Sequence, residues 1–480
     1  MASASKKPNN PVAFSLRTAL QTPLSFLWVL AVPACFVLIQ TLIGVTTPPA
    51  NEINVEIEWL KNEILPKLLE ERKLIADIDD ADLEKFQIVD ITIDFIGIEE
   101  AFMLTRCYRT KIVYDLKGVT NEIHLFVKKT PQIPQQLFDV INFKALFTND
   151  ILGYEKILPA IEDFAKSNLN VVKFYYGNLQ TNAGTLITSD FGSLGWRVTK
   201  DRVNLSLEHT LLAVKYLAKF HAAGFALKIT NEDKFNELTE GLLESRYANE
   251  INHPQILLKF DSGRKRIIKA TKQYQNHVPE EFLQKFDNLV SNHTEYGRKV
   301  LKPKEPFVTL CHGDYLRNNV AYKYQDDDPL QPTEVMMYDL QTLRVASPMI
   351  DLTTFLGFSN FAKVRHEHFK EIFEAYCRQL GESFEEYAKI PVPDYLSFDS
   401  LLKEYIRCLP NVVYISSWFL PDLVEPTELT PAEMMTQQPS DEEVIQDCMT
   451  RGGEVLDREL AHQMKELYEL AAEHNVDIFI

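Results

Sequence analysis

The chain has 480 residues, of which 45% are hydrophobic and 25% are charged, and its formal net charge is −18. This length exceeds what one hydrophobic core usually holds, and the composition argues against extensive disorder. A surface this acidic disfavours binding to nucleic acid phosphates, so we expect no nucleic-acid partner. It leaves open a small phosphate ligand, because one local basic pocket can hold a polyphosphate within an acidic protein.

The cysteines indicate free thiols. Six cysteines are spread along the chain, and none forms a Cys-x-x-Cys pair. A structural zinc site needs close ligand pairs, and disulfide frameworks belong to small secreted chains, so neither is predicted. The simple interpretation is a reducing compartment, and we expect a cytoplasmic domain.

Residues 1–50 form an N-terminal extension that contains a long apolar run. Residues 24–45 carry no charge and are long enough to cross a bilayer, which takes about 20 helical residues. Three interpretations stay open: an anchor that attaches the protein to a membrane, a cleaved signal peptide, or a spurious extension of the chain. Lys6, Lys7 and Arg17 before the run would keep the N-terminus of an anchored chain cytosolic. The rest would then lie in a lumen, which fits free thiols poorly.

The next part of the chain predicts an antiparallel sheet. Residues 54–74 have apolar positions at helical spacing. Three strand-like stretches follow, at 86–96, 102–114 and 122–128, and residues 115–118 between the last two are typical of a tight turn. Successive strands joined by tight turns favour antiparallel pairing.

The pattern then becomes mostly helical. A helix is predicted over 142–158, ending at Pro159, and short strands are predicted at 171–176 and 185–188. From residue 205 onward helical spacing dominates. We therefore expect an α+β fold in two parts after the extension: a sheet-rich part at 51–190 and a helical part at 191–480.

The sharpest signal lies in residues 308–322, VTLCHGDYLRNNVAY. An apolar run leads into His312 and Asp314, and Asn319 follows at the spacing H-x-D-x-x-x-x-N. In phosphoryl transfer a carboxylate accepts or orients the proton of the attacking hydroxyl, and an amide oxygen a few residues on can reach a magnesium ion. Asp314 and Asn319 suit these two roles. We expect His312 to support the catalytic loop through hydrogen bonds and not to act as the base.

A second carboxylate, Asp339, follows an apolar strand-like run in VMMYDLQ. Magnesium prefers carboxylate oxygen, so Asp339 is the natural metal ligand. Farther on, Asp351 in SPMIDL is expected to cap the helix that it opens. Each motif alone is weak, but their order and spacing within about 40 residues indicate a catalytic site. His221, among apolar helix residues, is expected to be a core histidine bonded to backbone.

These residues resemble the ecdysteroid kinase-like family, an insect-enriched group related to choline kinases and aminoglycoside phosphotransferases within the protein-kinase-like superfamily. The family pattern HGDLWxNN, DFQ and SPxxDL stands here as HGDYLRNN, YDLQ and SPMIDL. The resemblance extends to FVK at 126–128 and LAKFHA at 217–222, and it covers about residues 50–475. It implies a bilobal fold, in which an antiparallel-sheet lobe binds nucleotide and a larger helical lobe carries the catalytic loop and the acceptor site.

The resemblance also implies roles for residues of the first lobe. Lys128 stands where the family has its phosphate-binding lysine, and Asp150 stands where it has the carboxylate partner on a helix. Asp190 falls in the nucleotide-binding segment between the lobes, and Gly97 in the nucleotide loop. A buried strand lysine can hold its ammonium against the phosphates when a facing carboxylate positions it. Strand residues alternate, so only one of Lys128 and Lys129 can face the cleft, and the family spacing selects Lys128.

The implied function is ATP- and Mg²⁺-dependent transfer of phosphate to a hydroxyl of a small, lipophilic molecule, such as an ecdysteroid or a similar hydroxylated metabolite. An alternative stays open: a nucleotide-binding or inactive pseudokinase with a regulatory or binding role. It rests on residues 97–102, which retain one glycine and carry two acids, on Asp150 in place of glutamate, and on Ser189 in place of the hinge glutamate. The sequence gives no indication of the oligomeric state.

Overall fold

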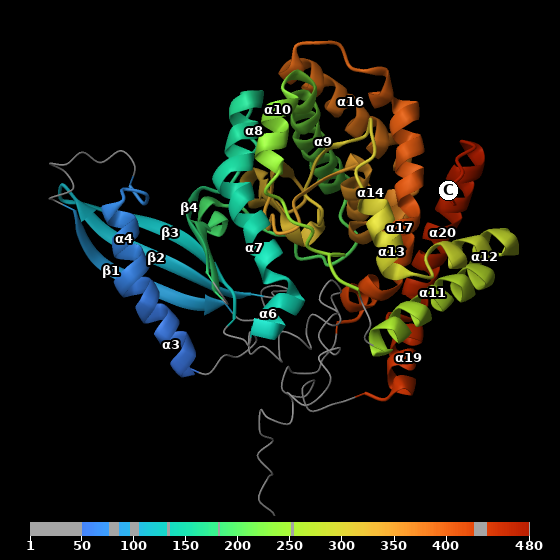
Figure 1. Ribbon diagram of the computed structural model, residues 1–480, viewed down its shortest axis with the longest axis horizontal. Coiled ribbons are helices and arrows are strands. Elements are labelled where there is room, and N and C mark those ends of the chain that lie inside the picture. The colour runs from blue at the N-terminus through green and yellow to red at the C-terminus, as the bar shows by residue number, and fades with distance from the viewer. Residues whose placement is uncertain are drawn as a thin grey trace, which may run out of the picture.

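The computed structural model describes residues 50–75, 86–96, 105–131, 135–180, 183–250, 254–426 and 439–479. The predicted nucleotide loop around Gly97 and the apolar run at 24–45 lie outside these ranges. Within them the chain forms a five-stranded antiparallel sheet followed by a mainly helical part, which confirms the predicted α+β fold (Figure 1). No helix of the described ranges combines the length and the apolar character that a bilayer crossing requires.

The strands of the sheet follow the order β1-β2-β3-β5-β4, and every neighbouring pair is antiparallel. Each lies where a strand was predicted, with boundaries shifted by a few residues. The bounds are β1 Gln87–Ile96, β2 Arg106–Leu116, β3 Val119–Lys129, β4 Phe174–Gln180 and β5 Ala183–Ser189. Because β3 is hydrogen-bonded to both β2 and β5, its side chains project from the middle of the sheet on both faces.

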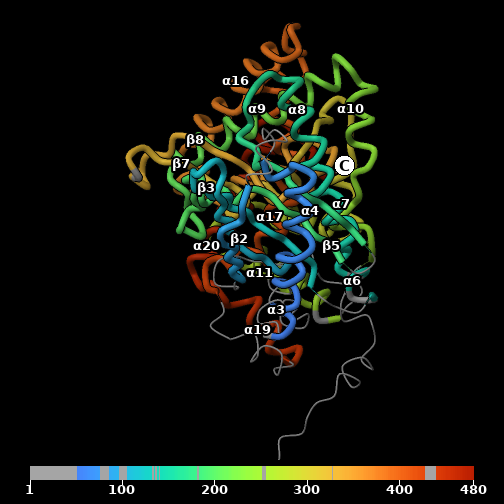
Figure 2. Tube along the Cα trace, turned by 90° about the vertical axis from the view of Figure 1, so that its left-hand side faces the viewer, coloured from blue at the N-terminus to red at the C-terminus, as the bar shows by residue number. Residues whose placement is uncertain are grey.

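One face of the sheet is covered by the first helices of the described chain. Helix α3 (Ala50–Trp59), a π-helical turn (Leu60–Ile64) and α4 (Leu65–Glu70) run across it as one irregular helix (Figures 1 and 2). Their apolar side chains form a cluster with strand residues that face them: Leu60, Ile64, Leu65, Leu68, Tyr108, Ile112, Leu125, Val127 and Ile187. Since the odd-numbered residues of β3 face this cluster, Lys128 faces the opposite side.

On the opposite face, α7 (Phe143–Leu152) and a π-helical turn (Gly153–Ile157) contact the sheet, while α6 (Gln135–Ile141) packs on α7 and α8 (Leu158–Ala165) packs on α9 (Leu207–Thr230) of the helical part. Helix α7 packs against β4 and β5. The prediction that this helix ends at Pro159 is wrong, because Pro159 lies in the first turn of α8. Proline is tolerated in the first turn of a helix, where its missing N–H has no required helical partner, and here that helix follows a widened π-helical turn.

The helical part is organised around α9 (Leu207–Thr230), which packs along α16 (Phe369–Ala388). The other helices and three-ten turns are Phe191–Leu194, α10 Glu232–Thr239, α11 Pro254–Tyr274, α12 Glu280–Leu289, α13 His293–Leu301, Arg317–Asn319, Gln325–Asp327, α14 Pro348–Ser359, α15 Ala362–Arg365, Asp394–Leu396, α17 Phe398–Val424, α19 Asp441–Thr450 and α20 Gly453–Glu473. Most of their apolar side chains join one continuous core with α7 and α8.

Two small sheets in the helical part determine where the predicted catalytic residues lie. Strand β6 (Thr309–Cys311) pairs with β9 (Arg344–Ala346), and β7 (Val320–Tyr324) pairs with β8 (Pro332–Met337). The connection from β6 to β7 and the connection from β8 to β9 therefore both join the same two sheets and run side by side. They contain the HGD motif and Asp339.

Candidate active site

Asp351 of α14 contacts and supports the predicted catalytic loop, residues 312–319. The Asp351 carboxylate accepts hydrogen bonds from the backbone N–H groups of His312, at 2.7 Å, and Gly313, at 2.8 Å. Gly313 has φ +81°, and a Cβ there would lie 2.1 Å from the carbonyl oxygen of Thr342. Only glycine therefore allows this tight turn between the apolar strand and Asp314.

Asp351 does not cap its own helix, contrary to the sequence prediction. Ser347 is the N-cap of α14, and its hydroxyl accepts from the N–H of Met349. Buried Asp351 instead contacts His221, with Nε2 3.1 Å from its carboxylate. Burial raises the pKa of Asp351, but the bonds from His221 and the loop outweigh it and hold that pKa below its ordinary value. The carboxylate thus stays charged beneath the loop.

His221 is a buried core residue, as predicted, although its partners are side chains and not backbone. Its Nδ1 lies 2.8 Å from the hydroxyl of Tyr376. Together with Cys311 and Asp351 it offers ligand atoms within 4.8 Å of one another. Burial raises the pKa of the Cys311 thiol, which donates to the carbonyl of Ser347 at 3.4 Å and so stays protonated. We therefore interpret this group as support for the loop and not as a metal centre.

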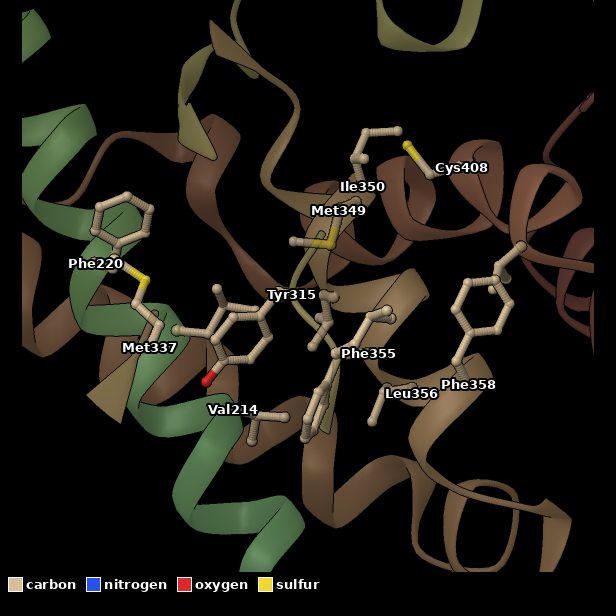
Figure 3. Close-up of a cluster of buried hydrophobic side chains, with 14 of the residues drawn as sticks. Val214, Phe220, Tyr315, Met337, Met349, Ile350, Phe355, Leu356, Phe358 and Cys408 are labelled. Carbon is tan, nitrogen blue, oxygen red and sulfur yellow. The ribbon is translucent and has the colours of Figure 1, made fainter. Parts of the chain in front are cut away.

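Asp314 is positioned by its neighbours on the loop. Asn319 donates from Nδ2 to the Asp314 carbonyl at 2.8 Å and to its carboxylate at 3.2 Å. The next residue, Tyr315, is fully buried, and its ring lies among Val214, Met337 and Phe355 (Figure 3). Burial of this ring in the core fixes the backbone next to Asp314.

His312 joins the catalytic loop to the loop of Asp339. Its Nε2 lies 2.9 Å from the carbonyl of Tyr338, and its Nδ1 accepts from the N–H of Asp314 at 3.3 Å. The N–H of Tyr338 in turn donates to the carbonyl of Asn319 at 3.0 Å. These contacts place Asp314 and Asp339 on adjoining loops.

Asp339 has a backbone conformation that is rare outside glycine. Its φ is +63°, in the left-handed region, and holding a residue other than glycine in this conformation costs of order 1–3 kcal/mol in free energy. Two side chains from the helix over the sheet hold it there: the Tyr154 hydroxyl accepts from the Asp339 N–H at 2.9 Å, and the Asp150 carboxylate accepts from the Leu340 N–H at 2.9 Å. The strain aims the Asp339 carboxylate away from the core and toward Lys128.

Lys128 of β3 connects the sheet to the helical part. Its ammonium donates to Asp150 at 2.7 Å, to Asp339 at 2.6 Å and to the Gln341 side chain at 3.2 Å. Burial opposes its charge, but the attraction of Asp150 and Asp339 outweighs burial and raises the pKa of Lys128. Lys129 points to the other face, so Lys128 is the lysine directed toward the catalytic loops.

Residues 99–388 match the sequence profile of the ecdysteroid kinase-like family. This chain belongs to the ecdysteroid kinase-like family. The match spans more than half of the chain and contains every predicted site residue except Gly97. A search of curated proteins found no match. Family membership indicates a kinase-like phosphotransferase that acts on small molecules.

In this ecdysteroid kinase-like protein, two predicted nucleotide residues do not join the others. Asp190 caps the short turn after β5, where its carboxylate accepts from the N–H of Gly192 at 3.0 Å and lies 3.6 Å from Arg109. Among the described residues these contacts do not include Lys128 or Asp339. Gly97 lies outside the described residues.

Sequence reasoning missed two side chains of this ecdysteroid kinase-like site. Gln341 receives Lys128 and donates to the Asp339 carboxylate at 3.1 Å. It follows Asp339 by two residues, and its place in the family-like YDLQ stretch was the signal that could have identified it. Arg246 forms an ion pair with the carboxylate of Asp314. No motif surrounds Arg246, and its proximity to Asp314 arises only from the fold.

Proposed function

We propose that this protein is an ATP- and Mg²⁺-dependent phosphotransferase that phosphorylates a hydroxyl group of a small, lipophilic molecule, with ecdysteroids and similar hydroxylated metabolites as the first substrates to test. One observation supports it above the others. Lys128 is held between Asp150 and Asp339 on the loop that adjoins Asp314 and Asn319. Phosphoryl transfer requires such a set, with a cation for the phosphates, carboxylate and amide oxygens for a metal, and a base for the hydroxyl.

The donor set fits a hard divalent cation. Asn319 uses its amide nitrogen on Asp314, which leaves the amide oxygen as the atom available to a metal. Asp339 is partly exposed, and its carboxylate already forms an ion pair with the Lys128 ammonium. Oxygen ligands of this type suit magnesium. Asn319 and Asp339 would hold Mg²⁺, which would neutralise negative charge on the triphosphate.

The roles of the side chains follow from their positions. Lys128, kept charged by Asp150, exchanges its contact with Asp339 for the phosphates of the nucleotide. Asp314 accepts the proton of the acceptor hydroxyl while the hydroxyl oxygen attacks the γ-phosphorus. The bond from that phosphorus to the β–γ bridging oxygen breaks, and ADP leaves. His312 and Asn319 keep the Asp314 carboxylate aligned with this line of attack. The strained backbone of Asp339 maintains a fixed direction for the metal ligand before nucleotide binds.

The test is ATP turnover against a panel of hydroxylated steroids and plant compounds, with wild type and three Asp→Asn variants. Asp314→Asn should lower turnover by roughly 10³-fold, because it removes the base, and should keep the thermal shift caused by MgATP. Asp339→Asn should lose that shift. Asp261→Asn, which changes two ion pairs within α11, with Arg264 and Lys265, is the matched control and should behave as wild type.

Two results would contradict the proposal. Full turnover in Asp314→Asn would remove that carboxylate from its role. A wild-type protein that shifts with MgATP but phosphorylates nothing in the panel, and hydrolyses no ATP, would favour the pseudokinase alternative.

A further inference from the structure

Arg246 forms an ion pair with the Asp314 carboxylate, which the proposed reaction needs as its base. It belongs to the connection after α10, and its guanidinium forms an ion pair with Oδ1 of Asp314. The side chain is part-buried, with 21% of its area exposed, so part of it remains accessible from solvent. Within the described ranges, Asp314 is the one side chain that accepts a hydrogen bond from this guanidinium, which has five N–H donors, and the nearby Glu244 carboxylate also attracts its charge.

The backbone around Arg246 is fixed, in contrast to its long side chain. Before it, both the N–H and the carbonyl of Leu243 are bonded to the side chain of Asn149 on α7, at 2.8 and 2.9 Å. The Glu244 carboxylate accepts from the N–H of Arg246 itself at 2.7 Å. After it, Arg298 donates to the carbonyl of Tyr247 at 2.7 Å. The guanidinium can therefore change partner while its Cα stays in place.

The ion pair with Asp314 cannot persist during the proposed reaction. A guanidinium that contacts this carboxylate oxygen excludes the acceptor hydroxyl from it. Arg246 must therefore leave Asp314 when the hydroxyl arrives, and its charge needs a new anionic partner nearby. The phosphoryl group that approaches the same hydroxyl is that anion, and the planar fork of arginine matches phosphate oxygens.

We propose that Arg246 is a further catalytic residue, which moves from Asp314 to the transferring phosphoryl group and stabilises its charge in the transition state. This inference rests on the proposed function. The hydroxyl oxygen forms a bond to the γ-phosphorus, the bond to the β–γ bridging oxygen breaks, ADP leaves, and the hydroxyl proton goes to Asp314. Arg246 gives up no proton and donates hydrogen bonds to the equatorial oxygens. Lys128 and Arg246 would then hold the phosphate chain from the Asp339 side and the Asp314 side.

Binding of two nucleotide probes tests the role without a known acceptor. The first probe is MgADP, and the second is MgADP with aluminium fluoride, which mimics the phosphoryl group in transfer. Isothermal titration of the full chain would compare wild type with Arg246→Gln and Arg246→Lys. Arg264→Gln is the matched control, because Arg264 is also part-buried (17% exposed) and also forms carboxylate ion pairs, but on α11.

We expect Arg246→Gln to lose about 100-fold in affinity for the aluminium fluoride complex, as for loss of one transition-state donor, with little change for MgADP. Arg246→Lys should lose less, because it keeps the charge without the fork. Arg264→Gln should match wild type for both probes. If Arg246→Gln does not fold, the lysine variant carries the test through the same ratio of affinities.

Three results would overturn the role of Arg246 alone: equal losses for both probes, no loss for either, or faster ATP turnover in Arg246→Gln, which would identify the ion pair as an inhibitory contact. A wild-type protein that binds neither probe would overturn the proposed function itself and the inference with it. The two failures are therefore distinguishable in one set of titrations.

Discussion

Lys128 and Lys129 are adjacent on β3, are similarly buried, and face opposite sides of the sheet. Their side chains are 10% and 13% exposed. Lys128 meets two carboxylates at hydrogen-bonding distance, whereas Lys129 lies 3.9 Å from Glu56 and 4.0 Å from the ring centre of Trp59. The two faces thus offer the same type of residue two different electrostatic surroundings.

The comparison shows what decides the charge of a buried lysine. Burial disfavours the ammonium on both faces. On one face, Asp150 and Asp339 outweigh it and raise the pKa of Lys128; on the other, burial dominates over Glu56 and lowers the pKa of Lys129. Glu56 is also engaged by Arg106, at 3.2 Å, so its charge is shared. We infer that one face is arranged for chemistry and the other for packing.

The largest expected effect separates the two lysines by activity. Lys128→Met should lower ATP turnover by roughly 10³-fold, because no other cation in the described part of the chain contacts both Asp150 and Asp339. Lys129→Met should leave turnover close to wild type, since it changes the packing face only. Steady-state kinetics of both variants with MgATP measures the difference. Comparable losses in the two variants would break the comparison.

A smaller effect separates the two carboxylate partners by stability. Glu56→Gln leaves Arg106 buried without one of its counter-ions and should lower the free energy of unfolding by about 3 kcal/mol, with the folded fraction still active. Asp150→Asn should instead raise the KM for MgATP by roughly 10-fold, because Lys128 loses its positioning partner. Urea unfolding and kinetics of both variants check this. A Glu56→Gln protein with raised KM and normal stability would reverse the assignment of the faces.

The smallest effect is a pH dependence of opposite sign for the two lysines. The folded pKa of Lys129 is lowered, so the unfolded chain binds more protons in the window below its ordinary pKa, and stability rises with pH there. Relative to Lys129→Met, wild type should therefore gain stability as pH rises toward the unfolded pKa of about 10.4. Lys128, with a raised pKa, stabilises fully below its unfolded pKa of about 10.4 and loses this contribution only as pH rises above it. Denaturant unfolding across this range measures the difference, and a flat profile would contradict it.

Local patterns were sufficient to predict much of the fold. Alternation gave the strands of the sheet, and the HGD and YDLQ stretches marked the two loops that meet. The choice of Lys128 over Lys129 needed only the period of a strand together with family spacing. These features are encoded in short stretches of sequence, so they can be read without knowing how distant segments pack.

Contacts between distant segments could not be predicted in this way. The sequence pattern predicted Asp351 as the cap of its own helix. In the structure Ser347 caps that helix, and the Asp351 carboxylate instead accepts from the buried N–H of Gly313, 38 residues earlier. Arg246 lies in an irregular connection without periodicity. Its partner Asp314 is 68 residues away, and contacts of the neighbouring backbone, such as that of Leu243 with Asn149, help bring them together.

Lys128 meets its two carboxylates at very different separations along the chain, 22 residues to Asp150 and 211 to Asp339. Contacts between distant residues carry a larger closure entropy and tend to form later. During synthesis the sheet can therefore close around Lys128 with Asp150 already beside it, well before the ribosome has delivered Asp339. If the sheet forms in this order, Asp150 already provides a counter-ion for the buried ammonium before Asp339 is synthesised.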